Sequence, residues 1–255
     1  MICLIAVILL LAGSSAFGAD PASPERFAAT SDKVVCFGDS ATEGASELSF
    51  PDYLEAFIEW GDGQVVNEGK SGETAEEGMW RMWWLLFSLK YINSHVWTYM
   101  EGGNDLIDWV TQIDPYLLFD PANPGYPHRQ ELDDKLAQIK DDLRTGIHNI
   151  RNKTSAEVVL GTYNYLASFT QCDPSPIGFL LPGMTEKANH YVDELNDNIR
   201  DLASEEDTPL ADINESLGNF NGNLLFYHDC IHMNSLGNFV VALIWLVQIA
   251  PYVNG

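Results

Sequence analysis

Basic residues are scarce in this chain. Among 255 residues there are 13 lysines and arginines against 37 aspartates and glutamates, which gives a formal net charge of −24. Such a surface repels nucleic acid and anionic membranes, so neither is expected as a partner. The charge is compatible with a neutral or cationic substrate, but solubility in a salty medium would explain it as well.

Long apolar runs are also few. Leu4–Ala12 is too short for a confident membrane span, and Ala16-Phe17-Gly18 resembles a small-x-small cleavage site. We therefore expect residues 1–19 to be a signal peptide, although lysine and arginine are missing before the apolar run. Residues 20–255 would then be an exported, single-domain protein. Phe239–Ala250 is apolar too, but a packed terminal helix explains it better, so stable membrane insertion is not expected.

Cysteine is limited to four residues. Cys3 falls within the predicted signal peptide, and Cys36 lies in an apolar strand pattern that predicts a buried, inert thiol. Cys172 and Cys230 could form a disulfide in an oxidising compartment. An odd number of mature cysteines forbids complete pairing, and the sequence leaves the bridge open.

Neither an internal repeat nor a second domain is evident, and strands alternate with helices along the chain. A short β-branched run predicts a strand at 33–37, and further short strands are expected at 64–67, 95–100, 157–162 and 209–213. Apolar residues at helical spacing predict helices at 50–60, 74–89, 131–150, 185–203 and 235–250. The proline-containing stretch at 115–127 and the segment 165–184 are expected to be irregular. This alternation predicts an α/β fold with a parallel sheet of about five strands covered on both faces.

Three candidate site residues each follow a predicted strand. Ser40, Gly72 and Asn104 are 32 residues apart in succession. Because ligands bind beyond the carboxyl ends of parallel strands, these residues should meet at one edge of the sheet. Ser40, after Gly38, is the candidate nucleophile, since a tight turn there can project its hydroxyl. Taken alone, Gly-Asp-Ser is more often an ordinary polar turn.

His232 is the candidate base that would take the serine proton. Asp229 lies three residues earlier, a spacing that lets its carboxylate reach the other ring nitrogen and hold the tautomer. The pair could also be a surface contact or half of a metal site. The sequence offers no second cluster with ligand spacing, so we expect no metal and no cofactor.

Three donors could stabilise an oxyanion. They are the backbone N–H of Ser40, the backbone N–H of Gly72 and the side-chain amide of Asn104, which follows two glycines. A lone Gly72 would more often be a turn glycine. Its place in a run from Asn67 to Thr74 shifts that balance toward a functional role.

The four blocks together resemble the SGNH/GDSL hydrolase family. They are Gly38-Asp39-Ser40, Ser71-Gly72-Glu73-Thr74, Gly102-Gly103-Asn104-Asp105 and Asp229-Cys230-Ile231-His232. Ala41 stands where the family's name has leucine, a position that varies. The resemblance implies a three-layer α/β/α, flavodoxin-like fold and carboxylic ester hydrolysis by Ser40, His232 and Asp229. It does not fix the substrate.

These observations predict a secreted serine esterase that acts on a small-molecule or glycan ester, with short acyl groups first and acetylated carbohydrates among them. Longer acyl esters, as for a lysophospholipase or lipase, are the alternative, followed by acyl transfer and by a non-catalytic binding protein. The helix containing Trp80, Trp83 and Trp84 could line an acyl pocket, although core packing is favoured. The oligomeric state stays open.

Overall fold

The structure is a computed structural model that describes residues 33–45, 48–58, 64–168 and 180–253. All of them belong to the unit Ser31–Gly255. The predicted signal peptide and Cys172 lie outside the described residues.

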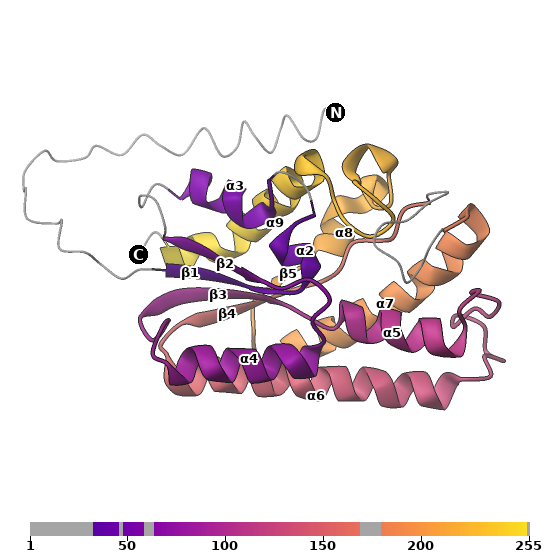
Figure 1. Ribbon diagram of the computed structural model, residues 1–255, viewed down its shortest axis with the longest axis horizontal. Coiled ribbons are helices and arrows are strands. Elements are labelled where there is room, and N and C mark those ends of the chain that lie inside the picture. Colours follow the sequence, from indigo (N-terminus) through magenta and orange to yellow (C-terminus); the bar gives the residue numbers. More distant parts are fainter. Residues whose placement is uncertain (1–32, 46–47, 59–63, 169–179, 254–255) are drawn as a thin grey trace, which may run out of the picture. The chain divides into compact units, whose positions relative to one another are not determined.

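The centre of the fold is a five-stranded parallel sheet with the order β2-β1-β3-β4-β5 (Figure 1). The strands are β1 (Lys33–Gly38), β2 (Val65–Gly69), β3 (Ser94–Met100), β4 (Glu157–Gly161) and β5 (Leu210–Ala211). This is the flavodoxin-like order, in which the chain reverses its winding between β1 and β3. The α/β fold class is confirmed, and every strand begins and ends within two residues of the expected range.

Alternating strand residues separate the core into two halves. In β1, Val34 and Cys36 join one buried cluster, whereas Val35 and Phe37 join the other. Successive side chains of a strand point to opposite faces, so an unbroken apolar strand requires cover on both sides.

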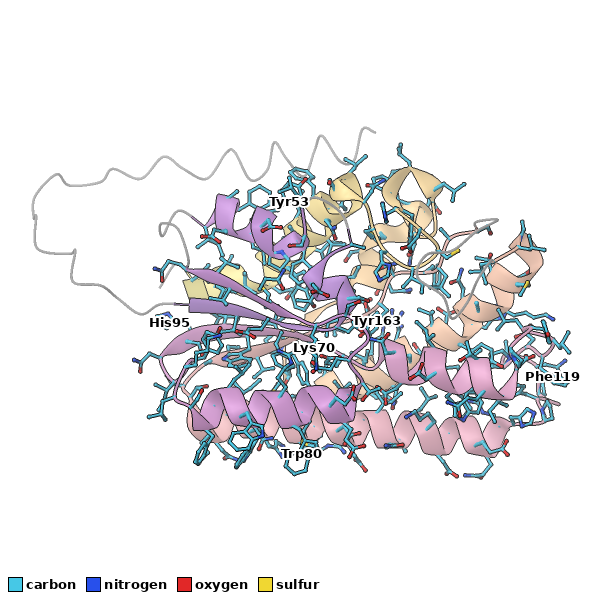
Figure 2. The ribbon with its side chains drawn as sticks, viewed as in Figure 1. Tyr53, Lys70, Trp80, His95, Phe119 and Tyr163 are labelled. Atoms are coloured by element: carbon cyan, nitrogen blue, oxygen red, sulfur yellow. The ribbon has the colours of Figure 1, made fainter. Side chains whose placement is uncertain are left out.

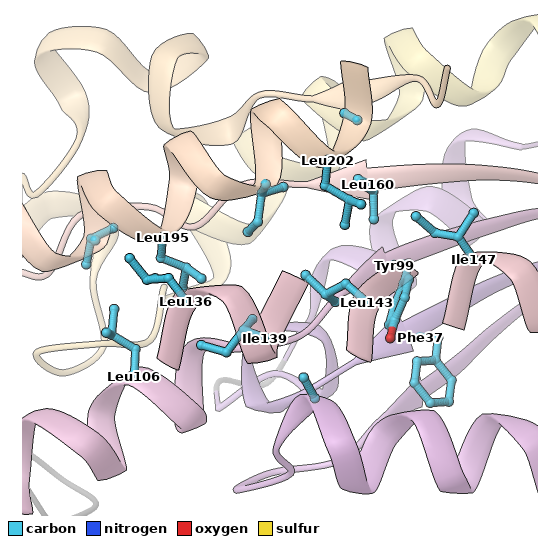
Figure 3. Close-up of a cluster of buried hydrophobic side chains, with 14 of the residues drawn as sticks. Phe37, Tyr99, Leu106, Leu136, Ile139, Leu143, Ile147, Leu160, Leu195 and Leu202 are labelled. Carbon is cyan, nitrogen blue, oxygen red and sulfur yellow. The ribbon is translucent and has the colours of Figure 1, made fainter. Parts of the chain in front are cut away.

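One face of the sheet is covered by α4 (Ala75–Phe87), α6 (Arg129–Lys153) and α7 (Pro182–Glu205). Figure 3 shows where the apolar sides of α6, α7 and the sheet meet, through Leu136, Ile139, Leu143 and Ile147 of α6, Leu195 and Leu202 of α7, and Tyr99 and Leu160 of the strands. The helical spacing that predicted α6 thus describes its buried face.

The opposite face is covered by α3 (Phe50–Phe57) and α9 (Ser235–Val253). Among the described helices, α9 is the one long and apolar enough to cross a membrane by composition. Its buried side packs on the sheet, where Trp245 stacks on Phe50 with ring centroids 5.7 Å apart. Packing in the core therefore accounts for the apolar residues on the buried side of this helix.

Three helices were not expected from the sequence. They are α2 (Ser40–Glu43), α5 (Gly103–Ile113) and α8 (Ile213–Leu217). The start of α5 is hidden because its N-cap is Gly102, which offers no capping side chain and adopts a positive φ of 108°. In addition, α7 begins at Pro182, earlier than expected, and proline is favoured in the first turn of a helix.

The tryptophans of α4 contradict the expectation of core packing. The buried face of α4 consists of Ala75, Gly78, Met82 and Leu86. The opposite face carries Trp80, Trp83, Trp84 and Phe87, which we call the α4 aromatic face; Trp84 and Phe87 are more than 60% exposed. Figure 2 shows Trp80 on the outer side of α4, away from the sheet. A helix on a sheet buries one stripe only, and the tryptophans lie outside it.

The contact of Trp245 with the sheet should dominate the stability of the α9 layer. Trp245 is fully buried, and an added Cβ at Gly161 would lie 2.4 Å from its ring. We expect Trp245→Ala to lower the free energy of unfolding by about 3–5 kcal/mol, measured by urea denaturation. Trp245→Phe should cost much less, because it keeps most of the apolar area and removes an indole N–H that has no partner among the described residues. Equal stability of the alanine variant and the wild type would contradict this account.

Candidate active site

Ser40 stands at the carboxyl end of β1, on the first residue of α2. Asp39 is the N-cap of this short helix, and its carboxylate accepts a hydrogen bond from Ala41 N at 2.9 Å. This turn presents Ser40 Oγ to His232, whose Nε2 lies 2.9 Å away. The distance is within the range for transfer of a proton from a serine nucleophile to a base.

Asp229 fixes the histidine through both of its carboxylate oxygens. One oxygen accepts the backbone N–H groups of Ile231 and His232, each at 2.7 Å. The other lies 2.7 Å from His232 Nδ1. Because Nδ1–H donates to the carboxylate, Nε2 is left as the acceptor that faces Ser40. Residues 229–232 thus form a closed turn, and the spacing of three residues noted in the sequence lets Asp229 reach the imidazole ring of His232.

Burial alone would raise the pKa of Asp229 and is the largest single influence on it. The hydrogen bonds from the His232 side chain and from the two backbone N–H groups outweigh that influence and lower the pKa below its usual value. Asp229 therefore remains a carboxylate that holds the imidazole next to it.

Gly72 and Asn104 lie on either side of the serine. Gly72 has a φ of +77°, which glycine adopts without strain, and it follows β2. Asn104 lies in the first turn of α5 and donates one amide hydrogen from Nδ2 to Glu73 O at 2.9 Å. An amide nitrogen carries two hydrogens, so a second one remains to bind an oxyanion. Ala75 N also donates to Asp105 Oδ2 at 2.7 Å, so a second hydrogen bond joins the segment after β2 to the first turn of α5.

All five residues that the sequence singled out lie in one region. Ser40, Gly72, Asn104 and His232 line a single cavity, and Asp229 stands behind His232. The structure thus brings together a hydroxyl, an imidazole, a carboxylate and amide donors at the point where the sheet reverses its winding. This arrangement can carry out nucleophilic acyl transfer.

Tyr163 and Asp39 also help to position the serine, a role that the sequence did not predict. Tyr163 OH donates to Asp39 Oδ2 at 2.6 Å, which fixes the carboxylate that caps α2. The backbone of Tyr163 is held in turn by the side chain of Asn196, with hydrogen bonds of 2.7 and 2.8 Å. Figure 2 places Tyr163 beside the ends of the strands. Since Tyr163 follows β4, the strand-end rule that found Ser40 would have found it.

A buried acidic cluster lies behind the loop that carries Gly72. Glu73 is buried, and its two carboxylate oxygens share the hydrogen of Arg81 Nε, at 2.9 and 2.8 Å. Glu101, directly after β3, is fully buried, and neither of its carboxylate oxygens has a hydrogen-bond partner among the described residues. Burial above all, and then the charges of Asp39 and Glu73, hold the pKa of Glu101 well above its usual range. Burial likewise raises the pKa of Asp39 to about 6.

The cavity extends from Ser40 into the space between α5 and α7 and has a volume of about 250 Å³. One face of α7 lines it at helical spacing, with Met184, Ala188, Tyr191, Val192 and Leu195. The facing residues of α5 include Leu106, Ile107, Val110 and Thr111. Most of these side chains are apolar, so the cavity suits an apolar group next to the serine. The tryptophans of α4 do not line it.

The described residues hold no group of three histidine, cysteine, aspartate or glutamate side chains arranged for a metal ion. The expectation of metal-free chemistry stays a prediction. Cys36 is a free, buried thiol, whereas Cys230, within the Asp229–His232 turn, is disulfide-bonded. Disulfides persist in oxidising compartments. Export itself stays a prediction.

Comparison with known proteins agrees with this geometry. The model of the GDSL-like lipase/acylhydrolase family matches residues 36–238. No curated protein sequence matches the chain. The chain belongs to the GDSL-like lipase/acylhydrolase family, and it is therefore of the carboxylic ester hydrolase class.

Solved structures show the same fold at low identity. A lipase/acylhydrolase from Enterococcus faecalis is 19% identical, with a TM-score of 0.59, over 86% of this chain and 96% of that one. A catalytic mutant of an acetylxylan esterase from Geobacillus stearothermophilus is 17% identical, with a TM-score of 0.58, over 86% and 94%. An aryl esterase from M. smegmatis is 17% identical, with a TM-score of 0.56, over 87% and 99%. At these identities the likeness supports the fold and not a substrate.

The buried carboxyl of Glu101 should make stability depend on pH. Its folded-state pKa is raised, so the folded protein keeps a proton that the unfolded chain loses above about pH 4.5. The wild type should therefore lose stability relative to Glu101→Gln as the pH rises above that value, measured as unfolding free energy between pH 4 and 8. Glu186→Gln, the same change at an exposed position, is the matched control. A difference between wild type and Glu101→Gln that is constant with pH would contradict the assignment.

Proposed function

We propose that this chain is a serine esterase that hydrolyses carboxylic esters through an acyl-enzyme on Ser40, with an apolar acyl group held between α5 and α7. The observation that carries the proposal is the apolar cavity that begins at Ser40 and His232. The family membership supports ester hydrolysis, and the cavity supports the choice of acyl group.

The chemistry follows from the hydrogen bonds of the site. Ser40 Oγ attacks the ester carbonyl carbon, and its proton passes to His232 Nε2, whose positive charge Asp229 stabilises. The negative oxygen that forms is bound by the N–H groups of Ser40 and Gly72 and by the amide of Asn104. The intermediate collapses as the alcohol leaves with the proton from His232. Water then attacks the acyl-enzyme by the same route and releases the acid.

The acyl group fits the cavity better than the alcohol does, since the attacked carbonyl must lie between Ser40 and the oxyanion donors, one of which, Asn104, is on α5. From there an acyl chain can follow the apolar faces of α5 and α7, and its burial is favourable at roughly 25 cal/mol per Å² of apolar surface. An acetyl group would leave most of this surface unused. The sequence-based preference for short acyl groups stays a prediction, and it also fits the acetylxylan esterase named among the similar structures.

Replacement of the nucleophile should remove turnover while the fold survives. We expect Ser40→Ala to lower kcat by about 10⁴ or more, because the residues of such a triad act as one unit. Asn104→Ala should lower kcat by roughly 10²–10³, with a smaller effect on KM. Hydrolysis of p-nitrophenyl butyrate gives the rates, circular dichroism checks the fold, and labelling by a fluorophosphonate should require Ser40.

The same assay separates the rival chemistries. Activity that is lost in EDTA and restored by a divalent ion would favour Asp229 and His232 as metal ligands. Fluorophosphonate labelling is not expected from a non-catalytic binding protein. New esters formed in the presence of an acceptor alcohol would indicate an acyltransferase.

The length of the preferred acyl chain tests the role of the cavity. Among p-nitrophenyl acetate, butyrate, octanoate and laurate, we expect kcat/KM to rise from acetate to octanoate. Ala188→Phe should fill the cavity wall and reduce octanoate hydrolysis by at least about tenfold more than acetate hydrolysis. Ala203→Phe, a buried α7 position that does not line the cavity, controls for a general loss of packing. A preference for acetate that Ala188→Phe leaves unchanged would restore the short-acyl, carbohydrate-ester assignment.

A further inference from the structure

Exposed apolar side chains flank, along the chain, the residues that line the end of the cavity remote from Ser40. The cavity follows α5 for most of its length, about 15 Å at the helical rise, and reaches Pro115 and Leu117 after the helix and Leu180 before α7. The last residue of α5 and these two segments also turn apolar side chains to the surface, namely Ile113, Tyr116, Leu118, Phe119 and Leu181. We call these five residues the apolar rim. Figure 2 shows Phe119 beyond the end of α5.

Two sets of hydrogen bonds hold the rim in place. Both carboxylate oxygens of Asp114 accept backbone N–H groups, from Leu118 and Phe119, each at 2.8 Å. Lys187 Nζ, on α7, donates to the carbonyls of Leu117 at 2.9 Å and Leu118 at 2.8 Å. The charges of Asp114 and Lys187 are thereby engaged with the backbone, and the side chains of Tyr116 and Leu118 remain about two-thirds exposed. Apolar surface fixed in this way is typical of an interaction site.

The position of the apolar rim and the net charge of the chain together indicate what kind of partner binds there. The apolar lining of the cavity continues onto the rim, so an acyl chain could pass from one to the other with little exposure to water. A net charge of −24 disfavours a second copy of the chain and an anionic membrane. A lipid surface without net charge would not be repelled by the negative charge of the chain.

We propose that the apolar rim docks on a neutral or zwitterionic lipid surface, from which an ester places its acyl chain in the cavity. This inference rests on the proposed function, since it names the physical form of the substrate for the same site. Tyrosine and leucine side chains are well suited to the boundary between headgroups and acyl chains.

The α4 aromatic face is the rival surface and supplies the matched control. Its exposed side chains are as apolar as those of the rim, but no residue of α4 lines the cavity, whereas Pro115, Leu117 and Leu180, next to rim residues in the chain, do. If apolar exposure alone caused lipid binding, both surfaces would contribute.

The first experiment measures binding of the full chain to phosphatidylcholine vesicles by flotation. We expect Tyr116→Ser/Leu118→Ser to reduce the partition coefficient by about tenfold or more, and Trp84→Ser/Phe87→Ser to change it by less than about twofold. Addition of phosphatidylglycerol to the vesicles should weaken binding at low salt. The inference is overturned if the wild type does not bind, if the α4 pair causes the larger loss, or if the anionic vesicles bind better.

A probe on the rim tests the contact directly. An environment-sensitive dye on Leu118→Cys should shift to the blue when phosphatidylcholine vesicles are added, whereas the same dye on Phe87→Cys should not. Cys36 should stay unlabelled because it is buried, and burial raises the pKa of its thiol to about 12. A shift at position 87 with none at position 118 would move the docking surface to α4.

Kinetics separate the failure of this inference from failure of the proposed function. The rim pair should lower hydrolysis of laurate esters carried in phosphatidylcholine vesicles several-fold more than hydrolysis of dissolved p-nitrophenyl butyrate. Wild-type activity on the dissolved ester without vesicle binding would overturn the docking surface alone. Vesicle binding through the rim without hydrolysis of any ester would overturn the proposed function alone.

Discussion

The hydrogen bond between Ser40 and His232 joins residues that are 192 positions apart, and much of the architecture serves to make it. A serine hydroxyl is a weak nucleophile until an imidazole accepts its proton, so the two atoms must be held within a few tenths of an ångström. The serine side is fixed by the end of β1 and by the Asp39 cap, which Tyr163 holds. The histidine side is fixed by three hydrogen bonds to one carboxylate, that of Asp229. Neither side depends on the flexible end of a long side chain.

The parallel sheet supplies the common frame for these parts. Its strand order places the turns after β1 and β3 side by side, at the position where the helices diverge to opposite faces. The same divergence leaves the space that α5 and α7 enclose, so the cavity and the chemical groups have one structural origin. The buried acid Glu101 and the ion pair of Glu73 with Arg81 lie directly behind this edge, which places polar groups of high energetic cost next to the site.

Much of this arrangement could be predicted from the sequence, because its signals are local. Short strand patterns between the helices predicted all five strands, and the spacing of three between Asp229 and His232 predicted their contact. Features that depend on tertiary contacts could not be predicted. The start of α5 has a glycine cap and carries no capping side chain, so the wall of the cavity was not foreseen. The aromatic residues of α4 were assigned to the core because composition does not show which stripe of a helix faces the sheet. The unpartnered carboxyl of Glu101 is visible only once its neighbours are placed.

The order of the site residues along the chain also bears on how activity emerges during folding. Ser40 comes from the first strand, whereas Asp229 and His232 come from the loop just before the last helix. Contacts of such long range form late, since the loop-closure entropy must be overcome before they stabilise the chain. Under the proposed mechanism, a nascent chain exposes a serine without its base and is chemically inert. Hydrolysis begins only when the loop before α9 has closed over the sheet, so turnover itself reports that folding is complete.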